Sequence, residues 1–355
     1  MSEEPVWQYI WQENVFGDTF YGTSCLAIHL TGEYCSYEEP MQNNLSFIIT
    51  DIVILFLQLT GIVCNGFILF MFFRVKKLYR NEALRLVLYL AITDFLHAIT
   101  TLPYIIYLVV FWNPYSINLD PYFIMISSTP LIIQLKINLT LTIAIALERT
   151  MALFTPVLYR KLSSSLYATA SLLLGMAFAC GDLALEFALS PFVEQPNCAA
   201  IGCYVSDKFR YYWGISNMVF GLFVIVLTVM ILLKLRSIHN HSKSARILVN
   251  KDAGRFRQAN RTSVGILSTS LLFVTLPSVG VGFVEMIGFS IFKTVGPFYI
   301  VGLLSAGACN SIVYVVLNKD LRALAKSCIT GGGLSTSTSA TTRVSMSRFQ
   351  STMNK

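Results

Sequence analysis

Seven apolar stretches run along the chain, and each is long enough to cross a lipid bilayer as an α-helix. They lie at about 46–73, 84–110, 122–154, 166–190, 212–235, 264–289 and 295–317. A helix of roughly 20 apolar residues spans the hydrocarbon layer of a membrane. Only 13% of the residues are charged, against about a quarter in soluble domains. The sequence therefore predicts an all-α membrane protein, a bundle of seven transmembrane helices.

The basic residues predict how this bundle is oriented. All but four of the 26 Lys and Arg residues fall in the first, third and fifth connections, at the adjoining helix ends or in the carboxyl-terminal tail; the exceptions are Lys136, Lys208, Arg210 and Lys293. Lys and Arg are retained on the cytoplasmic side during insertion. We therefore expect the amino terminus outside and the carboxyl terminus inside. The net charge of +7 then faces the cytoplasmic lipid surface, which argues against a nucleic-acid partner.

Four segments follow from these boundaries. Residues 1–45 form an extracellular amino-terminal segment without an evident signal peptide, and 46–317 form the transmembrane domain. Residues 318–329 are basic and amphipathic, which predicts a helix on the membrane surface with Cys328 as a palmitoylation candidate. Residues 330–355 form a disordered tail rich in Ser and Thr. Its phosphorylation would recruit an arrestin-like protein, although flexible low complexity explains the composition equally well.

Two kinds of modification are predicted on the extracellular side. Asn44 begins the sequence Asn-Leu-Ser, a glycosylation site close to the membrane. Cys25, Cys35, Cys198 and Cys203 all lie outside, so two disulfides with three possible pairings are allowed. Proximity favours Cys198 with Cys203, which leaves Cys25 with Cys35, but a link between the amino-terminal segment and the second extracellular loop stays open.

Charged and polar side chains at fixed places in the spans predict a switch. Glu148 and Arg149 lie at the cytoplasmic end of the third span, where each neutralises the other until Arg149 meets a better partner; an ordinary helix-end ion pair is the alternative. Asn65, Asp94 and Asn310 lie within three other spans. Unsatisfied polar groups are costly in hydrocarbon, so we expect these three to converge, as an activation network or as a static clasp.

These residues resemble the motifs of rhodopsin-like G-protein-coupled receptors over about residues 45–330. The matching positions are Asn65, Leu90, Ala91, Asp94, Glu148, Arg149, Ala152, Pro156, Tyr159, Asn310, Ser311 and Tyr314. More narrowly, the chain resembles nematode serpentine chemoreceptors of class bc in Asn197-Cys198 to Gly202-Cys203, Phe209-Arg210-Tyr211-Tyr212-Trp213, and Ala259-Asn260-Arg261 leading to Leu276-Pro277. The resemblance implies a receptor in the plasma membrane, with the sensory cilium as a candidate site. It also implies a small-molecule ligand, a heterotrimeric G protein and no cofactor.

Several departures from that family limit what the resemblance implies. The usual cysteine at the outer start of the third span is missing from residues 122–128, Thr275 replaces the aromatic residue near the proline of span six, and Ser311 replaces a proline in span seven. Pro277 remains. A proline inside a helix removes one backbone hydrogen bond and bends the axis, so Pro277 is a candidate pivot for the inner half of span six, or a static kink.

Ionisable residues within the spans are the candidates for binding a ligand. Asp182 and Glu186 stand four residues apart on one helical face, Lys136 lies in the outer half of span three, and Glu285 ends span six. Intramembrane charges mark functional sites by default, but a structural clasp between spans three and four explains Lys136 as well. A transporter or channel would use the same charges as an ion path. An enzyme is disfavoured because the four histidines are scattered along the chain.

Overall fold

All the regular secondary structure that the structure describes is helical. The computed structural model describes residues 40–75, 84–244, 251–288 and 298–318, and the short pieces 321–323 and 325–326. Seven segments within these ranges are long and apolar enough to cross a membrane: Leu45–Arg74, Arg85–Val110, Pro121–Phe154, Ser164–Leu189, Asp207–Ile238, Gln258–Met286 and Tyr299–Leu317. They coincide with the seven predicted stretches, so the predicted fold class is confirmed.

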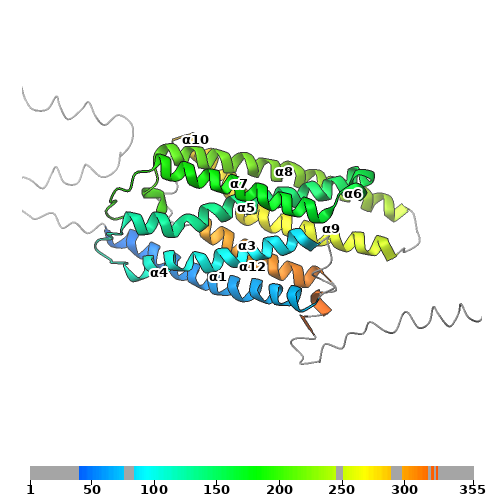
Figure 1. Ribbon diagram of the computed structural model, residues 1–355, viewed down its shortest axis with the longest axis horizontal. Helices are drawn as coiled ribbons and strands as arrows, with labels where there is room; N and C mark the ends of the chain where they lie inside the picture. The colour runs from blue at the N-terminus through cyan, green and yellow to red at the C-terminus, as the bar shows by residue number, and fades with distance from the viewer. Residues whose placement is uncertain are drawn as a thin grey trace, which may run out of the picture.

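The helices lie side by side along the long axis of the molecule (Figure 1). In chain order they are α1 (Pro40–Arg74), α3 (Arg85–Thr100), α4 (Leu102–Val110), α5 (Pro121–Phe154), α6 (Pro156–Lys161), α7 (Ser164–Leu189), the 3₁₀ turn η4 (Ile201–Cys203), α8 (Asp207–Ser244), α9 (Lys251–Ser270), the π-helical η5 (Leu271–Thr275), α10 (Leu276–Met286) and α12 (Phe298–Leu317). Helix α1 begins before the apolar stretch predicted to start at 46. Helix α8 begins before its predicted stretch, 212–235, and ends after it.

Helix α5 runs through the centre of the bundle. It packs against α3, α7, α8 and α9, and buried residues make up 78% of its most apolar window, against 22% in α1, α7 and α8. The surrounding helices expose large apolar side chains outward, including Phe56, Val63, Leu173 and Phe223. Apolar surface of this kind would be costly in water but is suited to lipid, because the helices satisfy their own backbone hydrogen bonds.

Local signals explain where several helices begin. The Asp120 carboxylate accepts a hydrogen bond from the Tyr122 backbone N at 2.9 Å, with Pro121 in the first helical position of α5. The second span divides into α3 and α4 at Thr101, just before Pro103. The Thr101 hydroxyl donates to the carbonyl of His97 at 2.7 Å, and the Thr101 backbone N donates to the same carbonyl at 3.1 Å, so both bonds hold the end of α3.

Two apolar clusters fill the interior, one near each end of the bundle. The first contains Tyr104, Ile201 and Trp213, and we call its end the disulfide end. The second contains Ile145 and Tyr314, and we call its end the Arg149 end. Along α5 the clusters meet at residues 137–139. The polar side chains that the sequence placed in mid-span lie at this junction.

Candidate functional site

Lys136 and Asp182 form the centre of a buried polar group where α5, α7 and α8 meet. The Lys136 Nζ lies 3.1 Å from the Asp182 Oδ2, and the exposed fractions of the two side chains are 1% and 3%. Lys136 Nζ also donates to the Ser216 Oγ at 2.9 Å, and the Tyr212 hydroxyl donates to the Asp182 Oδ1 at 2.9 Å. The Phe220 ring lies 4.8 Å from the Lys136 Nζ. A buried ion pair with such additional partners offsets part of its desolvation cost.

The other two residues predicted to bind a ligand lie apart from this ion pair. Glu186 stands one turn beyond Asp182 and is fully buried, and neither of its carboxylate oxygens has a hydrogen-bond partner among the described residues. Glu285 lies in the last turn of α10 and packs against Gly214 of α8. Within the described part of the chain, no ion pair or hydrogen bond joins Glu285 to Lys136. The four candidates therefore do not form a single cluster.

Asp94 is the centre of a second buried polar group, at the junction of the two apolar clusters. Its Oδ1 accepts hydrogen bonds from the Gln134 Nε2 at 2.8 Å and from the Asn138 Nδ2 at 3.5 Å. Asn310 of α12 also lies within hydrogen-bonding reach of Asp94. This contact depends on Gly307, where an added Cβ would lie 3.1 Å from the Asp94 side chain. The network thus ties α3 and α12 to the central helix α5.

Asn65 joins the same region from α1 through a different partner. Its Oδ1 accepts a hydrogen bond from the Ser311 Oγ at 2.6 Å, and its Nδ2 donates to the Gly61 carbonyl at 3.0 Å. Ser311 is the residue that replaces the usual proline of span seven. The substitution supplies a hydroxyl that links α12 to α1, a contact that proline could not make.

Glu148 and Arg149 form a buried ion pair at the end of α5. The Arg149 Nη2 lies 2.9 Å from the Glu148 Oε2, and the side chains are 6% and 4% exposed. Tyr159 of α6 lies within hydrogen-bonding reach of both, and its partial burial raises the pKa of the Tyr159 hydroxyl above its ordinary value. The short helix α6 therefore helps to enclose the pair.

The sixth span contains a π-helical segment, η5, which ends two residues before Pro277. Widened π turns accommodate strain in a helix and occur frequently at functional sites. The hydroxyl of Ser270, which precedes η5, lies 3.1 Å from the Thr142 hydroxyl of α5. Tyr314 of α12 is fully buried at the Arg149 end. The irregular part of the span is therefore bounded by a contact to α5 on one side and by Pro277 on the other.

A further contact holds the sixth span at the Arg149 end. The Gln258 Nε2 of α9 donates to the Asn318 Oδ1, just beyond α12, at 3.0 Å. The same oxygen accepts from the Leu321 backbone N at 3.3 Å. Residues 321–323 and 325–326 are helical. Asn318 thus links span six to the start of the segment predicted to lie along the membrane surface.

The loop between α7 and α8 is closed by a disulfide of its own. Cys198 and Cys203 are bonded, with 6.4 Å between their Cα atoms, and η4 ends at Cys203. The loop is tied to the second span in place of a disulfide to the third, because the Ile201 backbone N donates to the Tyr104 hydroxyl of α4 at 3.2 Å. Burial raises the pKa of the Tyr204 hydroxyl, in the same loop, to about 12. The loop therefore packs into the apolar core.

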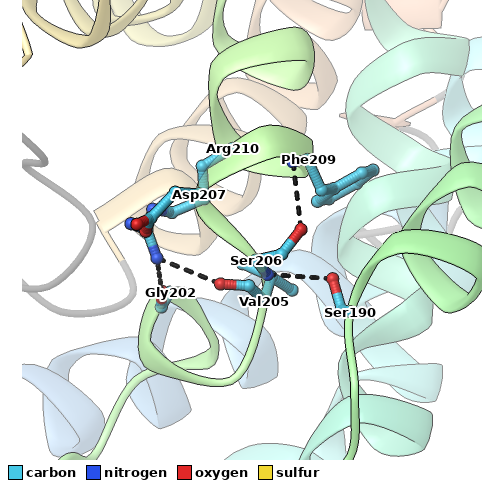
Figure 2. Close-up of polar contacts among 7 residues, drawn as sticks. All are labelled: Ser190, Gly202, Val205, Ser206, Asp207, Phe209 and Arg210. Carbon is cyan, nitrogen blue, oxygen red and sulfur yellow. Dashed lines mark hydrogen bonds and ion pairs between the residues drawn. The ribbon is translucent and has the colours of Figure 1, made fainter.

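Arg210 holds this loop against the start of α8 (Figure 2). Its Nη1 donates to the Gly202 carbonyl at 2.8 Å and to the Val205 carbonyl at 3.0 Å, and its Nη2 contacts Asp207. Ser206 caps α8 by accepting from the Phe209 backbone N at 3.2 Å. The Arg210 side chain is only 5% exposed. The clasp joins loop and helix without a disulfide between helices.

Replacing Arg210 with methionine is expected to loosen this loop. Two charge-assisted hydrogen bonds to carbonyls are lost, each with a net value of about 1.5–3 kcal/mol, together with the contact to Asp207. Hydrogen exchange measured by mass spectrometry on the purified protein should be faster over residues 199–206. Lys208→Met is the matched control, because Lys208 is exposed. Equal exchange rates in the Arg210 variant and in this control would show that the clasp contributes little.

Several predicted sites fall outside the residues that the structure describes. Cys25, Cys35, Cys328 and residues 331–355 belong to these parts of the chain, so the second disulfide, the palmitoylation site and the phosphorylated tail stay predictions. Asn44 lies in the backbone of α1, within its first turns. Its glycosylation also stays a prediction.

Some of the partners in these groups were not predicted from the sequence. Gln134 and Asn138 complete the Asp94 network, and Tyr212 and Ser216 complete the group around Lys136. A signal was available for the first two. Gln134 and Asn138 stand four residues apart within an apolar span, so they share one helical face. Arg210 had a signal too, because it belongs to the motif Phe209-Arg210-Tyr211-Tyr212-Trp213, but its contacts with the loop were not predicted.

The whole transmembrane bundle matches one protein family. The family model described as "Serpentine type 7TM GPCR chemoreceptor Srbc" matches residues 43–320, which include all seven spans. The chain belongs to this family. Among curated proteins no relative was found. The chain is therefore a chemoreceptor of the seven-helix, G-protein-coupled type and a multi-pass protein of the plasma membrane.

Proposed function

We propose that this receptor binds a small molecule on the outside of the cell and activates a heterotrimeric G protein on the inside. The observation that best supports this is the buried pair Glu148–Arg149 at the end of the central helix. A guanidinium at a membrane boundary is costly to bury alone, so it stays with Glu148 until another acceptor reaches it. A G protein inserted at the Arg149 end would supply that acceptor.

The sixth span is the element that we propose to move. Its inner half, α9, is held by two neutral hydrogen bonds, Gln258 to Asn318 and Thr142 to Ser270. Neutral hydrogen bonds contribute about 0.5–1.5 kcal/mol each, so a ligand of ordinary affinity can displace both. The π turn η5 and Pro277 would form the pivot. The Asp94 network lies between this pivot and the Arg149 end.

The same mechanism makes a thermodynamic prediction about agonists. A ligand that favours the active state must bind more tightly when the G protein is bound, since coupling between two sites is reciprocal. We expect agonist affinity to rise about 5- to 150-fold when G protein without nucleotide is added to the purified receptor. Nucleotide exchange on a panel of G proteins should increase with the same agonist. An agonist that binds with equal affinity in both conditions would contradict the mechanism.

The proposal also includes an arrestin-like partner and a chemosensory ligand. Phosphorylation of the Ser and Thr residues of the tail would add the charges that an arrestin-like protein recognises. A chemosensory ligand would also explain a location in a sensory cilium. The receptor family supports this function over the transporter or channel alternative.

A further inference from the structure

The interior of the bundle contains more carboxylates than cations. The ion pairs among the described residues are Lys136–Asp182, Arg149–Glu148 and Arg210–Asp207. Asp94 also lacks an ion-pair partner, but its Oδ1 accepts hydrogen bonds from Gln134 and Asn138. Three other buried acids, Asp51, Glu186 and Glu285, have no ion-pair partner in this part of the chain, and each has an oxygen without a hydrogen bond. A buried charge is normally paired. The receptor interior is therefore electrostatically complementary to a cation.

Glu285 is the one of these three acids that a ligand from the disulfide end would meet most readily. It is 8% exposed, against 0% for Glu186 and 1% for Asp51. It lies in the last turn of α10, which ends at Met286 and contains no basic residue in that turn. The carbonyl end of a helix carries partial negative charge and favours cations. The carboxylate and the helix end therefore both attract positive charge.

Two aromatic rings, those of Tyr299 and Trp213, lie in the neighbourhood of Glu285. The Glu285 side chain packs over Gly214, where an added Cβ would lie 3.3 Å from its Cγ, and it lies near Tyr299 of α12. Trp213, next to Gly214, meets Tyr299 edge to face with 5.3 Å between the ring centroids. The faces of Trp and Tyr attract cations within about 6 Å of the ring centroid.

A second unpartnered group lies on the same helix. Asn217 stands one turn beyond Trp213 on α8, is fully buried, and has no hydrogen-bond partner for either amide atom among the described residues. A buried amide without partners is costly. A polar group on a bound ligand would satisfy it.

We propose that the natural ligand is a small organic cation, an ammonium compound, whose charge is held by Glu285 against the rings of Trp213 and Tyr299. This inference rests on the proposed function, because it assumes a ligand from outside. The anchor for the cation is Glu285 and not the Lys136–Asp182 pair, whose two charges already cancel. Alkyl groups on the cation would lie on the aromatic faces, and a neighbouring hydroxyl or carbonyl would reach Asn217.

The experiment measures binding to the full-length receptor in nanodiscs without a G protein. The probes are choline, tetramethylammonium and hexylammonium, with dimethylbutanol, hexanol and hexanoate as neutral and acidic counterparts. The readout is the thermal unfolding midpoint as a function of probe concentration. We expect at least one ammonium compound to raise the midpoint, and its neutral counterpart to have no effect at the same concentration.

Variants then locate the anchor. Glu285→Gln should weaken the binding of that cation about tenfold or more, since a buried charge pair is lost, and Glu285→Asp should retain part of the affinity. Trp213→Leu should weaken it several-fold. Asp120→Asn is the matched control, because Asp120 is an exposed carboxylate at the same end of the bundle and asparagine also caps a helix.

Each failure has a distinct meaning. If no ammonium compound shifts the midpoint, or if the neutral and acidic compounds act equally, the ligand class is wrong. Unchanged cation affinity in Glu285→Gln would overturn the anchor. Nucleotide exchange is measured separately, so a receptor that binds the cation through Glu285 without stimulating exchange would contradict the proposed coupling and leave this inference intact.

Discussion

Replacing Lys136 with methionine is expected to destabilise the folded receptor by about 3–5 kcal/mol. The change leaves the Asp182 carboxylate buried with only the Tyr212 hydroxyl as a partner, and it removes the donor to Ser216. Breaking a buried ion pair costs more than the pair contributes, because the remaining charge is uncompensated. The measurement is the thermal or denaturant unfolding of the purified receptor, with Lys208→Met as the exposed control.

A double variant tests the reason for this loss. Lys136→Met combined with Asp182→Leu removes both charges, so most of the stability should return, since apolar replacements of buried pairs are often neutral. If the double variant is as unstable as Lys136→Met alone, the uncompensated charge is not the cause. The same protein also separates two roles of the pair. A stable double variant with unchanged agonist potency would assign Lys136 and Asp182 to the scaffold, whereas lost potency would assign them to ligand binding.

Replacing Glu148 with glutamine is expected to raise nucleotide exchange in the absence of ligand about tenfold. The Arg149 guanidinium loses its charged partner at 2.9 Å, so the resting state becomes less favourable relative to the active one. A change of 1–3 kcal/mol in such a balance corresponds to about 5- to 150-fold. Basal exchange is measured on receptor and G protein reconstituted together, at equal receptor density.

Matched variants show whether Arg149 itself carries the effect. Arg149→Gln should abolish agonist-stimulated exchange while the receptor still reaches the membrane. Lys161→Gln removes an exposed cation at the same end of the bundle and should change exchange little. Wild-type basal activity in the Glu148 variant, at normal expression, would support an ordinary helix-end ion pair in place of a switch.

Much of the architecture could be predicted because a bilayer imposes simple rules. Backbone groups in hydrocarbon must be satisfied within a helix, so apolar length alone identified seven spans, and the structure has the same seven. The motifs on four spans also led to the receptor family, which the family match confirms. The departures were less predictable. From the sequence, the serine at position 311 is only the absence of a proline, but in the structure its hydroxyl donates a hydrogen bond to Asn65.

The amino-acid sequence by itself determined the number of spans, the family and the residues that carry charge into the membrane, because each depends on local hydrophobicity or on motif order. Only the tertiary structure decided how those charges pair. It joined Lys136 to Asp182, left Glu186 and Glu285 without cations among the described residues, and placed Arg210 against the loop between α7 and α8. Electrostatic pairing falls off over a few ångströms. It therefore depends on helix rotation and loop path, which arise from packing across the whole bundle.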